Sequence, residues 1–217
     1  MSLTLHCLKY ATSVLPEAQA FDGGRTDHTV PIAFALYLIR ADGCTVLVDA
    51  GCDDMPGFAM TDHRSPVEVL AEAGVTPAEV TDVILTHAHH DHAAGARHFP
   101  DATFYLQRAE YEAAKAYLPP DASLVLFDGE YRLHDRIRIV EIGGHTVGSC
   151  VVEVSEGEIT HVLAGDECYL SDNLTRRLHT GATYDHRKAE AFLDTYVGKE
   201  YRVHTCHDIH LKTEQII

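Results

Sequence analysis

One short segment concentrates the residues with the greatest capacity for chemistry. Residues 86–92 read THAHHDH and directly follow the apolar stretch DVIL. The chain has 16 histidines among 217 residues, and at such frequencies chance predicts about 0.007 occurrences of the pattern HxHxDH. Imidazole is the commonest metal ligand in proteins and titrates near neutral pH. The segment therefore predicts a metal centre rather than a histidine-rich surface loop.

The spacing within this segment separates the side chains into two groups. His87 and His89 are two residues apart at the end of an extended stretch, so they point the same way. Asp91 and His92 follow after the chain turns. The two groups can therefore hold two metal ions close together. Nitrogen and oxygen ligands without a thiolate suit zinc, and also iron or manganese.

Three more polar residues each follow a predicted strand. They are His145, after RIRIVEI, Asp166, after ITHVLAG, and His207, after YRVHTC. Strand ends that meet at one rim are where a rigid scaffold assembles a site. The hypothesis is one metal ion bound by His87, His89 and His145, a second bound by Asp91, His92 and His207, and Asp166 bridging both.

The elements that must position these residues alternate between strands and helices. Apolar and β-branched stretches predict strands at Ala33–Arg40, Thr45–Asp49, Asp82–Thr86, Thr103–Gln107, Arg136–Ile142, Ser149–Val154, Ile159–Gly165 and Tyr201–Cys206, the first two joined by the turn 41–43. Capping signals predict a helix from Ser65 to Gly74 and a helical turn after Thr76, and composition predicts helices at Arg108–Tyr117 and His186–Val197. This alternation favours two sheets packed face to face with helices outside.

Composition excludes several classes of protein. Lys and Arg number 17 against 33 Asp and Glu, a net charge of -16, which argues against nucleic-acid and anionic-membrane partners. The longest apolar stretch, Val30–Ile39, is too short to span a bilayer. No signal peptide is evident and the six cysteines form no CxxC pair, so a cytoplasmic protein with reduced thiols is expected. No linker or repeat interrupts the chain, which predicts one domain over residues 1–217.

The order of the motifs resembles the metallo-β-lactamase superfamily. HAHHDH is followed by GHTxGS at 144–149, GD at 165–166 and HD at 207–208. The resemblance runs from TVLVDAG to the last of these histidines and implies an α/β fold, the αβ/βα four-layer sandwich of two mixed sheets with helices outside. It also implies that Asp49 supports the metal loop, as partners of metal ligands do.

Within the superfamily, the chain is most similar to the N-acyl homoserine lactone lactonases. Tyr169 stands three residues after Asp166, as in those quorum-quenching enzymes, and HDI at 207–209 resembles their ending. Glyoxalase II-like thioesterases and other ester hydrolases share the ligand set and stay open as alternatives, as does a metal sensor without turnover. The chain departs from the lactonases in Gly143, where proline is usual, in its lack of tryptophan and in its shorter length, which puts the acyl chain of the substrate in question.

The resemblance implies a zinc-dependent hydrolase that opens a lactone by attack of a metal-bridging hydroxide on the carbonyl. Asp166 holds the water and passes its proton to the leaving alkoxide, Asp91 or a metal ion helps to stabilise that alkoxide, and Tyr169 donates to the developing oxyanion. The expected partner is a small-molecule lactone or ester. The resemblance is compatible with a homodimer, although no segment argues for one. Met55, Phe58 and Met60 offer a lid or pocket wall for an apolar tail.

Overall fold

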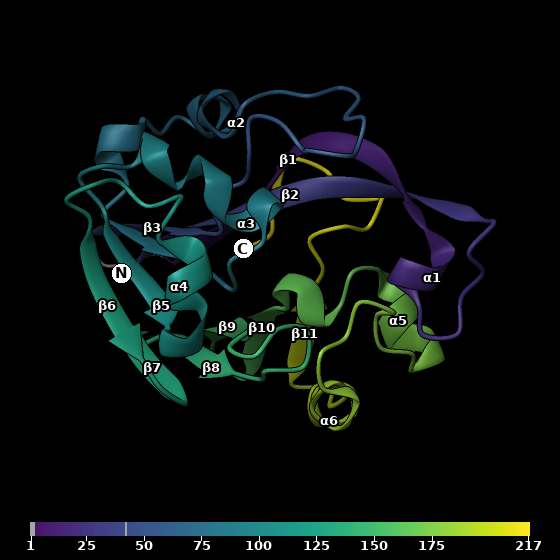
Figure 1. Cartoon of the computed structure of the whole chain (residues 1–217). Coiled ribbons are helices and arrows are strands. Elements are labelled where there is room, and N and C mark those ends of the chain that lie inside the picture. Colours follow the sequence, from purple (N-terminus) through teal and green to yellow (C-terminus); the bar gives the residue numbers. More distant parts are fainter. Residues whose placement is uncertain (1–2, 42) are drawn as a thin grey trace.

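A computed structural model of the chain, which describes residues 3–41 and 43–217, contains two β-sheets that face each other (Figure 1). The first sheet has seven strands. In spatial order they are β12 (Glu214–Gln215), β1 (Thr4–Pro16), β2 (Thr29–Ala41), β3 (Cys44–Val48), β4 (Asp82–Ile84), β5 (Thr103–Gln107) and β6 (Ser123–Phe127). Strands β12 to β3 pair antiparallel and β3 to β6 pair parallel, so this sheet is mixed.

The second sheet has five strands. Their order is β11 (Tyr201–His204), β10 (Ile159–Leu163), β9 (Cys150–Glu156), β8 (Ile137–Glu141) and β7 (Glu130–His134). Only β10 and β11 pair parallel, so this sheet is mixed as well. The predicted pair of mixed sheets is therefore confirmed.

Helices cover the outer faces of both sheets (Figure 1). They are α1 (Glu17–Ala20), α2 (Pro66–Glu72), α3 (His90–Ala93), α4 (Tyr111–Ala114), α5 (Ser171–Arg176) and α6 (His186–Thr195), with 3₁₀ turns at Pro77–Glu79, Ala94–His98, Arg108–Glu110 and Gly165–Glu167. Three apolar clusters separate the layers. One lies under α2, one lies between the sheets around Val48 and Ile139, and one lies under α6 around Phe192. This is the predicted αβ/βα sandwich. None of the described helices is long and apolar enough to cross a membrane.

The strongest local signals predict their elements well. Ser65 caps α2 by accepting the Glu68 N–H, and the Glu68 carboxylate accepts the Ser65 N–H in return. Gly74 follows the helix at φ 71°, a left-handed conformation that glycine adopts without strain. Thr103–Gln107 is a strand with the predicted bounds.

Two expectations need correction. The single helix predicted at Arg108–Tyr117 is wrong, since the segment forms a 3₁₀ turn and the four-residue helix α4. Good helix formers do not suffice there because the turn places Glu110 inside the protein. No element was predicted ahead of Ala33, yet β1 has 13 residues and β2 begins at Thr29. Of the predicted turn 41–43, Asp42 lies outside the described residues.

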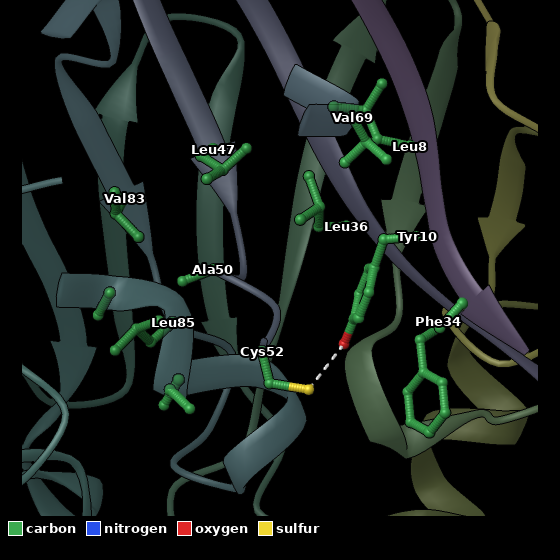
Figure 2. Packing of buried hydrophobic residues seen from close by; sticks show 14 of the residues in the cluster. Leu8, Tyr10, Phe34, Leu36, Leu47, Ala50, Cys52, Val69, Val83 and Leu85 are labelled. Carbon is green, nitrogen blue, oxygen red and sulfur yellow. Dashed lines mark hydrogen bonds between the residues drawn. The ribbon is translucent and has the colours of Figure 1, made fainter. Parts of the chain in front are cut away.

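One tyrosine connects the core under α2 to the HxHxDH segment. Figure 2 shows Tyr10 of β1 among Leu8, Phe34 and Leu36, with its hydroxyl pointing toward Cys52. The Tyr10 hydroxyl is 3.6 Å from the Cys52 sulfur and donates a hydrogen bond of 3.0 Å to the backbone carbonyl of Asp91. The packing of the first sheet thus fixes the backbone of the HxHxDH segment.

Candidate metal centre

The seven predicted side chains come from segments that follow strands, at one edge of the sandwich. His87 and His89 follow β4, and Asp91 and His92 lie on the short helix α3. The other three follow β8, β10 and β11, at His145, Asp166 and His207. The structure brings all seven together, and six of them are buried. His90 of the same segment points elsewhere, with its Nε2 atom 2.9 Å from the Asp54 carbonyl.

Three imidazoles and one carboxylate form the first group. The Nδ1 atom of His89 lies 2.9 Å from His87 Nε2 and 3.0 Å from His145 Nε2. The Oδ2 atom of Asp166 lies 3.4 Å from His87 Nε2 and 3.2 Å from His145 Nε2. Ligand atoms about 2.0–2.1 Å from a tetrahedral zinc ion are separated from one another by roughly 3.3 Å. The four atoms therefore have the spacing of a tetrahedral site.

Two imidazoles and two carboxylates form the second group. The other oxygen of Asp166, Oδ1, lies 3.0 Å from His92 Nε2 and 3.1 Å from His207 Nε2. The Oδ2 atom of Asp91 lies 3.5 and 3.4 Å from the same two nitrogens. Asp166 thus presents one oxygen to each group, which is the arrangement predicted for a bridging ligand.

Hydrogen bonds behind the centre fix how three of the histidines are protonated. His92 Nδ1 lies 2.7 Å from Asp49 Oδ2, and His207 Nδ1 lies 2.9 Å from the carbonyl oxygen of Ala33. Oxygens of these kinds only accept, so each Nδ1 carries a hydrogen and Nε2 is the nitrogen that can offer a lone pair to a metal ion. The Thr86 hydroxyl donates to Asp49 and so accepts from His87 Nδ1 at 3.1 Å.

The histidine nitrogens that face the centre show whether a metal ion fits there. Among the described residues, the buried His92 Nε2 has no hydrogen-bond partner. A buried acceptor that faces other acceptors is costly unless a cation or proton lies between them. Metal-ligating histidines commonly donate their second nitrogen to a carboxylate or carbonyl, as these do. The donor set and its spacing therefore fit two divalent ions.

Electrostatics at the centre favour an ionised carboxylate with positive charge beside it. Burial alone would raise the pKa of Asp166, but the histidines around it, His92 first, hold that pKa well below its usual range. Burial lowers the pKa of His87 and of His89. Burial opposes the charged forms of His92 and His207 as well, but Asp166 and Asp91 outweigh it and raise the pKa of both histidines. Asp166 thus stays an anion that two cations can share.

Tyr169 lies beside both groups. Its ring is 5.1 Å from that of His207 and 5.7 Å from that of His145, and only 7% of the residue is exposed. Burial raises the pKa of its phenol well above the ordinary value, and Asp166 and Asp91 add to the effect. Tyr169 therefore keeps its proton and is a hydrogen-bond donor.

A cavity of about 350 Å³ opens onto the centre. Tyr169 and four of the predicted ligands, His89, Asp91, Asp166 and His207, line it. Its remaining walls are mainly apolar and include Leu15, Ile32, Phe34, Met55 and Phe58. Met60, grouped with Met55 and Phe58 in the sequence analysis, packs against the core and is not among the residues that line the cavity.

Two buried glutamates that the sequence analysis did not single out hold the ligand loops. Glu110, 5% exposed, accepts the Ala88 N–H at 3.1 Å with one oxygen. Its other oxygen accepts the Thr146 hydroxyl at 2.7 Å and the Gly148 N–H at 2.9 Å. Glu110 thus joins the loop that carries His87 to the loop that carries His145.

Glu167 holds the second of these loops from the other side. Its Oε1 atom accepts the backbone N–H groups of Gly144 and His145, each at 3.1 Å. The Cys206 thiol donates to Asp166 Oδ1 at 3.3 Å. No local pattern marks Glu110, because its partners lie 22 to 38 residues away along the chain. For Glu167 and Cys206, the one sequence signal of a supporting role is that each stands next to a predicted ligand.

Comparison with known proteins agrees with this geometry. The family model described as the metallo-beta-lactamase superfamily matches residues 35–203. An N-acyl homoserine lactonase of Bacillus cereus is 28% identical over 162 residues, which cover 63% of this chain and 64% of that protein. A probable metallo-hydrolase of Methanocaldococcus jannaschii is 27% identical over 145 residues, 66% of this chain and 61% of that protein. The matches therefore span less than two thirds of these curated relatives.

Solved structures establish the fold. An N-acyl homoserine lactone hydrolase with N-hexanoyl-L-homoserine bound at its catalytic metal centre superposes with a TM-score of 0.84 at 21% identity, over 96% of this chain and 95% of that one. A dizinc quorum-quenching lactonase superposes with a TM-score of 0.75 at 19% identity, over 96% and 88% of the two chains. The resemblance and fold class indicated by the motifs are both confirmed.

Proposed function

Because this chain belongs to the metallo-β-lactamase superfamily, we propose that it is a binuclear metal-dependent hydrolase that opens the ring of an N-acyl homoserine lactone or a related lactone. The observation that carries the proposal is the position of Asp166, whose two oxygens lie within 3.0–3.4 Å of four histidine nitrogens in two groups. The likeness to lactonases in sequence and fold supports this substrate class.

The residues assigned to the metal ions are the predicted seven. His87, His89 and His145 would hold one ion, Asp91, His92 and His207 would hold the other, and Asp166 would offer one oxygen to each. Zinc is the proposed metal because it favours four ligands of nitrogen and oxygen at this spacing. When bound, such ions supply Lewis-acid polarisation of a carbonyl and activation of water at neutral pH.

The protein's own groups complete the reaction. Hydrolysis adds water across the ester bond, so the ring C–O bond breaks and the leaving alkoxide gains a proton. Asp166 carries that proton from the attacking water to the alkoxide. Asp91, which lines the cavity, accepts a hydrogen bond from the new hydroxyl group. The products are an alcohol and a carboxylic acid on one open chain, and the acid releases its proton to solvent at neutral pH.

Tyr169 stabilises the charge that develops on the carbonyl oxygen. Its phenol keeps its proton, its ring contacts those of His145 and His207, and the residue lines the cavity, so it is placed to donate to an oxygen there. A donor aimed at developing charge accelerates the reaction more than it tightens ground-state binding. Tyr169 is therefore proposed as a catalytic residue.

The apolar cavity walls suit a substrate with a hydrocarbon tail. A volume of about 350 Å³ falls within the usual range of small-molecule sites. Met55 and Phe58 come from the loop between β3 and α2 and face this space. Met side chains adapt to ligands of different shape. The proposal therefore places the acyl group against this wall and the lactone ring above the metal ions.

Substrate panels test the proposal. Zinc-loaded protein is incubated with hexanoyl- and decanoyl-homoserine lactone and, separately, with S-lactoylglutathione. Ring opening that disappears on chelation and returns with zinc is the expected result. Cleavage of the thioester without any lactone hydrolysis would assign the same centre to a glyoxalase II-like thioesterase. Zinc binding with no hydrolysis of lactone, ester or thioester would support a metal sensor.

A further inference from the structure

A second group of side chains of the types that bind metal ions lies outside the seven-residue centre, on segments that border the cavity. It consists of Asp22, just after α1, His179, in the segment between α5 and α6, and His186, the first residue of α6. One ligand atom from each lies within 4.8 Å of the other two. None of these residues belongs to the motifs that indicated the superfamily.

The protonation of His179 is fixed by its surroundings. The residue is 7% exposed, and its Nδ1 atom lies 2.9 Å from the carbonyl oxygen of Thr180. A carbonyl only accepts, so Nδ1 carries the hydrogen and Nε2 presents a lone pair. His179 Nε2 faces the other two residues: it lies 3.2 Å from His186 Nδ1 and 3.9 Å from Asp22 Oδ2. A carbonyl behind a histidine is the usual support of a metal ligand.

We propose that Asp22, His179 and His186 bind a further transition-metal ion, with zinc as the best fit. Two nitrogens on one tetrahedral zinc ion lie about 3.3 Å apart, close to the 3.2 Å between His179 Nε2 and His186 Nδ1. The Asp22 side chain is 55% exposed and is free to rotate toward them. Two imidazoles with one carboxylate select zinc, cobalt, nickel or copper over magnesium and calcium.

The ion would cross-link two segments that border the cavity, the one that follows α1 and the one between α5 and α6. The Asp22 N–H already donates to the His179 carbonyl at 3.0 Å, and the Gly181 N–H donates to the Gln19 carbonyl at 2.9 Å. Gln19 of α1 and Ala182 of the neighbouring segment both line the cavity. A metal bond from Asp22 to the two histidines cross-links these same segments. The site thus stabilises these segments without contributing to the centre.

Zinc stoichiometry tests the proposal without reference to activity. The full chain is stripped with a chelator, titrated with zinc at controlled free concentrations and analysed for metal per chain. His186→Ala is the informative variant because His186 is exposed, and Asp22→Asn removes a ligand with little change of shape. His28→Ala removes an exposed histidine outside the group and is the matched control. Thermal unfolding is recorded at each zinc concentration.

The wild type and His28→Ala are expected to bind about three zinc ions per chain, and both other variants about two. The melting temperature of the wild type should keep rising after the binuclear centre is full, since an ion that binds only the folded state stabilises it in proportion to its occupancy. That late rise should be missing in His186→Ala. Identical stoichiometry and identical melting curves in all four proteins would overturn the proposal, whether or not the chain hydrolyses lactones.

Discussion

The Nδ1 atom of His92 lies 2.7 Å from the Oδ2 atom of Asp49, and both side chains are buried. Asp49 also accepts the backbone N–H of Thr86 at 2.8 Å and its hydroxyl at 3.0 Å. One carboxylate therefore orients a histidine on α3 and the residue before His87. Asp49 therefore lies behind the proposed ligands and is not one of them.

Asp49→Asn should weaken zinc binding by roughly 10–100-fold while the protein stays folded. Asparagine tolerates the left-handed backbone of this position, φ 62°. It is neutral, however, and presents one acceptor oxygen where the carboxylate presents two. Competition for zinc with a chromophoric chelator measures the change, and Asp101→Asn, at an exposed position, is the control. Equal zinc affinity in both variants would remove Asp49 from the support of the centre.

Glu110→Ala should destabilise the zinc-free protein by on the order of 2–4 kcal/mol, because the buried N–H groups of Ala88 and Gly148 lose their acceptor. It should also loosen the centre, since the two ligand loops are no longer joined. Glu110→Gln keeps one acceptor oxygen and should be intermediate in both respects. Urea unfolding and zinc titration measure these effects.

Glu112→Ala, two residues away and exposed, is the matched control. If Glu110→Ala lost stability but kept the zinc affinity of this control, Glu110 would be a packing residue without influence on the metal ions.

Tyr169→Phe should keep its metal ions and its melting temperature but lower kcat for lactone hydrolysis by roughly 10²–10³-fold. KM should change much less, because the hydrogen bond strengthens as charge develops in the transition state. Steady-state kinetics, with metal content measured on the same sample, test this expectation. An unchanged kcat at full metal occupancy would exclude Tyr169 from the reaction.

Stability should depend on pH through His204, away from the centre. Its ring stacks on His161 at a centroid distance of 5.2 Å, and its Nε2 atom lies 2.9 Å from His161 Nδ1. Burial, with a smaller contribution from the charge of His161, lowers the pKa of His204 to about 4. Between that value and about 6.5 the unfolded chain binds a proton that the folded chain does not.

The free energy of unfolding should therefore fall as the pH is lowered through this window, by about 3 kcal/mol in total from His204. Above about pH 6.5 His204 carries no extra proton in either the folded or the unfolded chain, so this loss of stability is absent. Urea unfolding of zinc-free protein should show a shallower pH dependence for His204→Gln than for the wild type or His28→Gln. Parallel profiles for all three proteins would contradict the assignment.

The sequence predicts the proposed ligands well because each stands in a short pattern beside a strand. The HxHxDH segment, His145 in GH and Asp166 in GD are recognisable one at a time. Their grouping follows from the rule that strand ends meet at an edge of a sheet, and the distances around Asp166 agree with that grouping.

The supporting residues were not predictable in the same way. Glu110 lies in a stretch of good helix formers and acquires its role from Thr146, 36 residues away. Tyr10 reaches Asp91 across 81 residues. Strand β1 mixes polar and apolar residues without regular alternation, so its pairing with β2 and not its own pattern makes it a strand. Tertiary contacts determine these roles and this strand, so no local sequence pattern indicates them.

The most direct test of the binuclear hydrolase is a zinc titration of the stripped protein in which metal occupancy and hydrolysis of hexanoyl-homoserine lactone are measured on the same samples. The wild type should be inactive without metal and should gain activity as the two ions that share Asp166 are bound. Asp166→Ala should bind zinc weakly and stay inactive at every concentration. Full lactone hydrolysis by the stripped wild type, or by Asp166→Ala, would contradict the account.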